Sequence, residues 1–81
     1  MSEDRVDALT LDCVGMLCPR PIIELAKHLA DVPVGAVIVV LADDVAAASD
    51  VPAWCRMREQ EYLGADDAEG GAARYRVRRL R

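Results

Sequence analysis

The four prolines limit where helices can begin and end in this 81-residue chain. Proline lacks the backbone N–H that a helix interior needs, but it fits the first turn, where that group has no partner inside the helix. We therefore place Pro19 and Pro21 at the start of one helix and Pro52 at the start of another. Residues 32–35, which include Pro33, end the first helix.

The hydrophobic pattern changes its period along the first half of the chain. Residues 9–13 alternate between apolar and polar positions, which is typical of a half-buried strand. From Pro19 the apolar residues follow a helical stripe of about three turns, made of Ile22, Leu25, Ala26 and Leu29. Residues 36–42 form a continuous apolar run rich in β-branched side chains, which predicts a central strand.

A second helix is expected from Asp50 to about residue 60. Asp50 would be its N-cap residue, and Pro52 would lie in its first turn, where the missing N–H is harmless. A short helical turn over residues 45–49 is expected to precede it.

The last part of the chain predicts a hairpin. Residues 62–66 and 73–78 are expected to be two strands joined by a turn around residues 69–71. The complete order is then β-α-β-α-β-β, which predicts an α+β fold: a two-layer sandwich with two helices on one face of a four-stranded mixed sheet. We expect residues 1–7 to be a flexible N-terminal segment and residues 8–81 to be a single domain.

Composition excludes several classes of function. A net charge of −4 argues against direct nucleic-acid binding, because that affinity comes mainly from lysine and arginine. The first residues carry no apolar run, so we expect no signal peptide, no membrane contact and a cytoplasmic location. Three cysteines without Cys-x-x-Cys spacing favour neither a disulfide framework nor a zinc site. We expect no metal and no cofactor.

Cys18 is the main candidate for chemistry. If Pro19 is the first helical residue, Cys18 is the N-cap, and the helix dipole lowers the pKa of its thiol by about one unit, towards physiological pH. Pro21 removes a further helical N–H, which leaves the N–H of Arg20 as the donor able to reach the sulfur, and the Arg20 side chain adds positive charge. Oxygen-bearing side chains cap helices better than cysteine does, so a cysteine here indicates a chemical role rather than a small apolar filler.

The other two cysteines have a structural interpretation. Cys13 shares the parity of Leu9 and Leu11 in the first strand, which favours core packing, although it is near enough in sequence to resolve a persulfide or form a disulfide. Cys55 follows Trp54 on the second helix, and a structural role is favoured there too.

Three motifs together carry a resemblance to a known family. They are Gly-x-x-Cys-Pro-x-Pro at residues 15–21, Ala-Asp-Asp at 42–44, and Asp-Val-Pro-Ala-Trp-Cys at 50–55. With these motifs the sequence resembles the TusA-like (SirA-like) sulfur-carrier family over residues 9–77. The resemblance implies the same two-layer sandwich, a persulfide on Cys18, and a supporting motif of Gly15, Pro19, Arg20 and Pro21.

The resemblance also implies a function. Members of this family receive sulfane sulfur from a cysteine desulfurase or a rhodanese-type protein and pass it to an acceptor protein. Their outlets include tRNA thiolation, molybdenum-cofactor assembly and sulfur oxidation, and nothing in this sequence chooses among them. We therefore expect a persulfide carrier of the sulfurtransferase type rather than a multiple-turnover enzyme on a small substrate.

Two other functions remain open at this point. One is a thiol redox sensor that forms a Cys13–Cys18 disulfide. The other is a non-catalytic regulatory module that binds an acidic partner through one strand face, formed by Arg74, Arg76 and Arg78. The alternative for these arginines is cross-strand pairing with Glu61 and Asp66. The apolar residues on both sides of the central strand are compatible with a homodimer.

Overall fold

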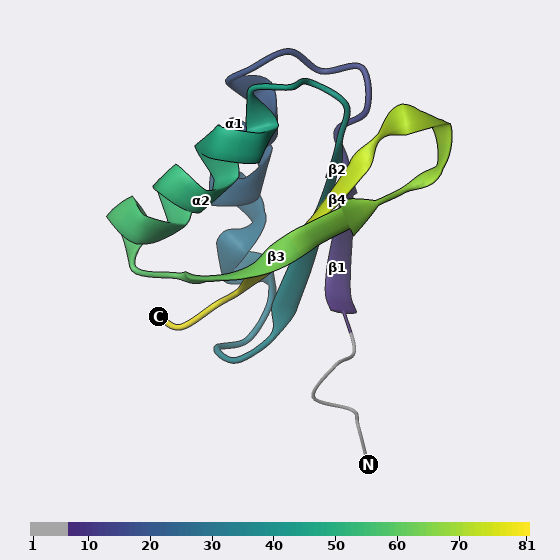
Figure 1. Cartoon of the computed structure of the whole chain (residues 1–81). Helices are drawn as coiled ribbons and strands as arrows, with labels where there is room; N and C mark the ends of the chain where they lie inside the picture. The colour runs from purple at the N-terminus through teal and green to yellow at the C-terminus, as the bar shows by residue number, and fades with distance from the viewer. Residues whose placement is uncertain (1–6) are drawn as a thin grey trace.

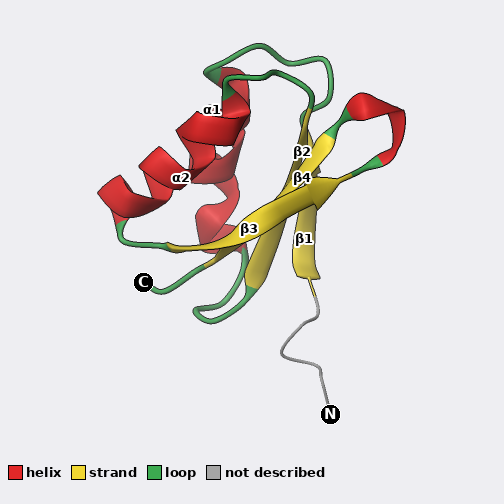
Figure 2. Ribbon diagram, viewed as in Figure 1, coloured by secondary structure: helices red, strands yellow, loops and turns green. Residues whose placement is uncertain are grey.

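The computed structural model describes residues 7–81 as a four-stranded sheet with two helices on one face (Figure 1). The elements in chain order are β1 (Asp7–Asp12), α1 (Arg20–His28), β2 (Val37–Ala42), α2 (Ala47–Arg58), β3 (Glu61–Asp67) and β4 (Ala73–Arg78). Short 3₁₀ turns, η2 (Leu29–Asp31) and η3 (Glu69–Gly71), follow α1 and join β3 to β4. Figure 2 shows the two layers, and the predicted α+β sandwich is confirmed.

The sheet is mixed, with strand order β1-β2-β4-β3. β1 and β2 are parallel, while β4 is antiparallel to both of its neighbours. A parallel pair needs a crossover connection, which α1 supplies. Of the segment expected to be flexible, residues 1–6 lie outside the described residues, and Asp7 lies in β1, where it pairs with Val37.

The core lies between the sheet and the helices. Its fully buried members include Leu25 of α1, Ile38 and Val40 of β2, Val51 of α2 and Val77 of β4. Val37 and Val39 are also buried, although they point to the face of the sheet without helices. The continuous apolar run of β2 is thus explained by burial on both of its sides.

The start of α2 differs from the prediction. The helix begins at Ala47, with Ala46 as its N-cap, and Asp50 lies within the first turn rather than at the cap. The N–H of Ala46 donates to a side-chain oxygen of Asp44, and the N–H of Ala47 donates to the Asp44 carbonyl. This turn leads directly into the helix, so the predicted short turn and the second helix are one element. Pro52 therefore lies inside α2, where it has no N–H to offer the preceding turn.

Truncation of Leu25 tests the packing of α1 on the sheet. Because the side chain is fully buried, Leu25→Ala should lower the free energy of unfolding by about 2–5 kcal/mol, through lost burial and a residual cavity. Ile23→Ala on the same helix is the matched control, since half of that side chain is exposed and its truncation should cost much less. Urea unfolding followed by circular dichroism measures both variants, and equal losses would contradict this assignment of the buried face.

Candidate functional site

Cys18 lies in the loop that joins β1 to α1. Because β1 and β2 are parallel, their carboxyl ends meet at the same edge of the sheet, and the loops that follow them run together at the top of Figure 1. The first loop carries Cys18, and the second carries Asp43 and Asp44 and leads into α2. Two segments far apart in the sequence therefore form one site.

Carboxylates of the second loop hold the backbone of the first. Asp43 Oδ1 accepts a hydrogen bond of 3.0 Å from the Gly15 N–H, and Asp44 Oδ2 accepts one of 2.7 Å from the Cys18 N–H. Gly15 has a φ of +86°, in the left-handed region that glycine adopts most readily. The motif glycine thus allows the chain to turn so that both N–H groups face the aspartates.

The ionisation of Asp44 contributes to this arrangement. The hydrogen bond from the Cys18 N–H, followed by that from the Ala46 N–H, lowers the pKa of the Asp44 carboxyl. A carboxyl whose pKa is lower in the folded protein than in the unfolded chain stabilises the folded protein at pH values above the unfolded pKa. The contribution is lost as the pH falls through the folded pKa. The Cys18 loop is therefore anchored near neutral pH and loosens in acid.

The start of α1 corrects the prediction for Cys18. The helix begins at Arg20 with Pro19 as its N-cap, so Cys18 precedes the cap instead of forming it. The reason lies in the first hydrogen bonds: the N–H groups of Ile22 and Ile23 both donate to the carbonyl of Pro19. The N–H of Arg20, which was expected to reach the sulfur, donates to the carbonyl of Leu17 at 2.8 Å.

The thiol of Cys18 instead meets a carboxylate. Cys18 Sγ donates a hydrogen bond to Asp50 Oδ2 at 2.5 Å. This hydrogen bond is the largest cause of a raised Cys18 pKa, and the charges of Asp50 and Asp44 add to it. The expectation of a lowered pKa was wrong, because a negative group in direct contact outweighs the partial charge of a helix end that lies one residue further along the chain.

Asp44 and Asp50 were not singled out as site residues from the sequence. They lie 26 and 32 residues from Cys18 along the chain, so no local periodicity connects them to it. The available signal was their membership of the two downstream motifs, in which Asp50 was expected to serve only as a helix cap.

Cys18 is the exposed cysteine of the three. Cys13 and Cys55 are each 1% exposed and belong to the core, as their sequence positions predicted. Burial raises the pKa of the Cys13 thiol and raises that of Cys55 to about 11. All three are free thiols. Reagents and partner proteins in solution therefore have direct access to Cys18 but not to the other two.

Apolar side chains surround the Cys18 loop. Leu17 is 74% exposed and Val45, next to Asp44, is 87% exposed. A groove of about 280 Å³ lies beside the loop and shares Pro19 and Asp50 with the site; its other lining residues are Ile22, Ala53, Trp54 and Met57. Exposed apolar groups around a reactive atom are a common feature of protein-binding surfaces.

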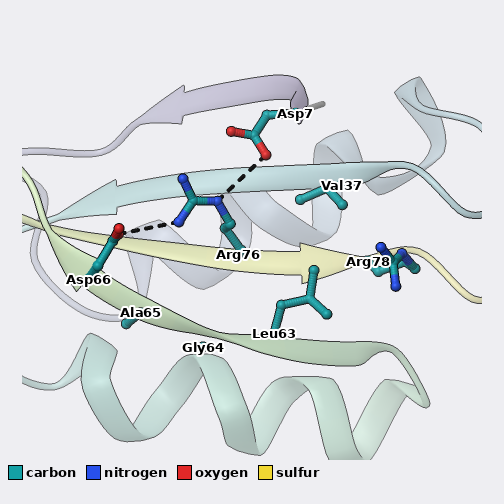
Figure 3. Close-up of a pocket in the computed structure, with 8 residues that line it drawn as sticks. All are labelled: Asp7, Val37, Leu63, Gly64, Ala65, Asp66, Arg76 and Arg78. Atoms are coloured by element: carbon teal, nitrogen blue, oxygen red, sulfur yellow. Dashed lines mark hydrogen bonds and ion pairs between the residues drawn. The ribbon is translucent and has the colours of Figure 1, made fainter. Parts of the chain in front are cut away.

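The arginines of β4 lie on the sheet face that the helices leave uncovered. Arg76 contacts Asp66 at 3.3 Å and Asp7 at 3.6 Å, on the two sides of a hollow of about 610 Å³ (Figure 3). Arg74 pairs with Asp66 and Arg78 with Glu61. The cross-strand pairs considered from the sequence are thus formed. This face of the sheet is charged but largely neutralised.

Comparison with known proteins identifies the family. A model of the sulfurtransferase TusA family matches residues 9–79, nearly the whole chain. The chain belongs to the TusA family. A relative from Archaeoglobus fulgidus, which carries a provisional name as a sulfur carrier protein, is 37% identical over 68 residues, or 84% of this chain and 88% of that one. Membership of the TusA family and this relative support a sulfur-carrier role.

The TusA-family fold is also seen in a crystal structure. The SirA-like protein from Desulfitobacterium hafniense superposes with a TM-score of 0.77 at 20% sequence identity. The match covers 90% of this chain and 99% of that one, which shows that the two share their fold. Within residues 7–81, none of the helices has the length and apolar character needed to cross a membrane.

The contact with Asp50 predicts a pH dependence for alkylation of Cys18. Only the thiolate reacts quickly, and Asp50 and Asp44 disfavour it, so the rate with iodoacetamide should reach half its maximum above the ordinary thiol pKa of about 8.5. Rates measured from pH 6 to 10 with peptide mapping would show this, and Cys13 and Cys55 should react only after denaturation. A midpoint well below about 8.5 would restore the helix-dipole interpretation.

Proposed function

We propose that this protein carries sulfane sulfur as a persulfide on Cys18 and passes it from a donor protein to an acceptor protein. The observation that carries the proposal is the exposure of Cys18, on an anchored loop with apolar surroundings, while the other two cysteines are buried. Membership of the TusA family supports it. A transferable sulfur must be reachable by the active sites of two different proteins, and an exposed loop provides that access.

The transfer of sulfur from one persulfide to another thiol needs no external oxidant, because its atoms and electrons balance. The Cys18 thiol loses its proton and attacks the outer sulfur of a donor persulfide, R–S–SH. A bond forms between Cys18 Sγ and that sulfur, the S–S bond of the donor breaks, and the donor thiolate takes up the proton. The products are Cys18–S–SH and R–SH, and the same exchange with an acceptor cysteine releases the sulfur. A cysteine desulfurase or a rhodanese-type protein is the proposed class of donor.

The anchored loop suits this task. Asp43 and Asp44 fix the backbone of Gly15 and Cys18, so little freedom is lost when a partner docks. Leu17 and Val45 offer apolar contacts on both loops of the site. The same surface then serves donor and acceptor in turn, which is what a carrier between two proteins requires.

The redox-sensor alternative has less support. A Cys13–Cys18 disulfide needs a reactive Cys13, but that side chain is buried and burial raises its pKa. The Cys13 N–H also donates to the Leu41 carbonyl at 2.8 Å, which ties this residue to the end of β2. The regulatory-module alternative needs free arginines on β4, and they pair with acidic side chains.

Replacement of the cysteines tests the proposal. After incubation with a cysteine desulfurase and cysteine, the wild-type protein should gain one reductant-labile sulfur on Cys18, as measured by intact mass and peptide mapping. Cys18→Ser should gain none and keep its circular dichroism spectrum, since the residue is exposed. Cys13→Ala is the matched control and should still be loaded with sulfur. Sulfur retained by Cys18→Ser would refute the assignment, and loss of loading in a folded Cys13→Ala would favour a two-cysteine mechanism.

A further inference from the structure

The hydrogen bond between Cys18 and Asp50 joins the sulfur to a carboxylate that has no charged partner among residues 7–81. Asp50 Oδ2 lies 2.5 Å from Cys18 Sγ. Over residues 7–81, Asp50 forms no ion pair with an arginine, lysine or histidine, in contrast to Asp7, Glu61 and Asp66 of the open sheet face. The other two carboxylates at the site accept backbone N–H groups: Asp43 from Gly15, and Asp44 from Cys18 and Ala46. Asp50 is therefore the group that acts on the thiol.

Given the proposed carrier function, we propose that Asp50, in contact with the reacting sulfur, sets how tightly Cys18 holds a transferred sulfur atom. Its carboxylate stabilises the empty thiol form and disfavours the sulfur-loaded form. The empty carrier is thereby protected from small electrophiles, and the loaded carrier gives up its sulfur more readily. Asp50 is not a helix cap in the structure, so this position leaves its side chain available for the sulfur.

The argument rests on where the hydrogen atoms are in the two states. In the empty protein the S–H of Cys18 donates to Asp50. In the persulfide the same Sγ is bonded to carbon and to the outer sulfur, so it has no hydrogen to donate. If the outer sulfur ionises, its negative charge lies near the negative carboxylate and is repelled. Asp50 thus favours the left side of the exchange Cys18–SH + R–S–SH ⇌ Cys18–S–SH + R–SH.

The same contact affects reactions with small reagents. A thiol must lose its proton before it attacks an alkylating agent or a peroxide, and a carboxylate in contact with the sulfur opposes that loss. The raised pKa of Cys18 is consistent with this effect. A protein partner can displace or neutralise Asp50 when it docks, whereas a small uncharged reagent has no such means. Asp50 thereby favours transfer between proteins over unspecific modification.

Asp50→Asn tests the proposal, because it keeps the size of the side chain and removes its charge. At pH 7 its Cys18 should react with iodoacetamide several-fold faster than in the wild type. At equilibrium with a fixed mixture of glutathione persulfide and glutathione, the ratio of loaded to empty Cys18 should also rise several-fold. Glu59→Gln is the matched control: it removes the same charge nine residues further along, about 13 Å as a helix rises, and should change neither value.

The outcomes separate this proposal from the carrier function itself. Unchanged alkylation or an unchanged loaded ratio in folded Asp50→Asn would overturn the proposal, even if wild-type Cys18 accepts sulfur. If neither protein accepts sulfur on Cys18, the carrier function fails and the role of Asp50 in release fails with it. Asp50→Ser, which also suits the first turn of a helix, is a second variant in case Asp50→Asn does not fold. Circular dichroism establishes the fold of each variant.

Discussion

The hydrogen bonds from the loop after β1 to the aspartates after β2 determine the rest of the site. Gly15 and Cys18 precede α1, which begins at Arg20, so their N–H groups take no part in the hydrogen bonds of that helix and need acceptors elsewhere. Asp43 and Asp44 accept them because the parallel pairing of β1 and β2 places both loops at one edge of the sheet. With these two hydrogen bonds the loop becomes a defined platform for a thiol.

Core packing then determines what this thiol meets. Val51 is fully buried against the sheet and Trp54, one turn later, is nearly so. These two residues fix the rotation of α2 about its axis. Asp50 directly precedes Val51, and the side chains of successive helical residues point about 100° apart around the helix axis. The Asp50 side chain therefore points out of the core, towards Cys18. Apolar packing in the interior thus sets an electrostatic contact at the surface.

The two polar regions of the protein differ in how their charges are balanced. On the open face of the sheet, the arginines of β4 lie opposite Glu61 and Asp66, and these ion pairs also cover the buried side chains of Val37 and Val39. At the Cys18 site the carboxylates bind backbone N–H groups and a thiol, and the described residues offer them no ion pair. One region stabilises the sheet, and the other is the region where we propose that a carboxylate controls the sulfur of Cys18.

Local patterns in the sequence determined the order of the elements and the burial of Cys13 and Cys55, and they predict Cys18 as the cysteine for chemistry. These features depend on neighbours within a few residues, where the periods of helix and strand apply. The tertiary structure alone decided the direction in which the Cys18 pKa shifts: the helix end was expected to lower this pKa, and the contact with Asp50 raises it. A pKa depends on charges within a few ångströms, and 32 residues of sequence separate this carboxylate from the sulfur that it contacts.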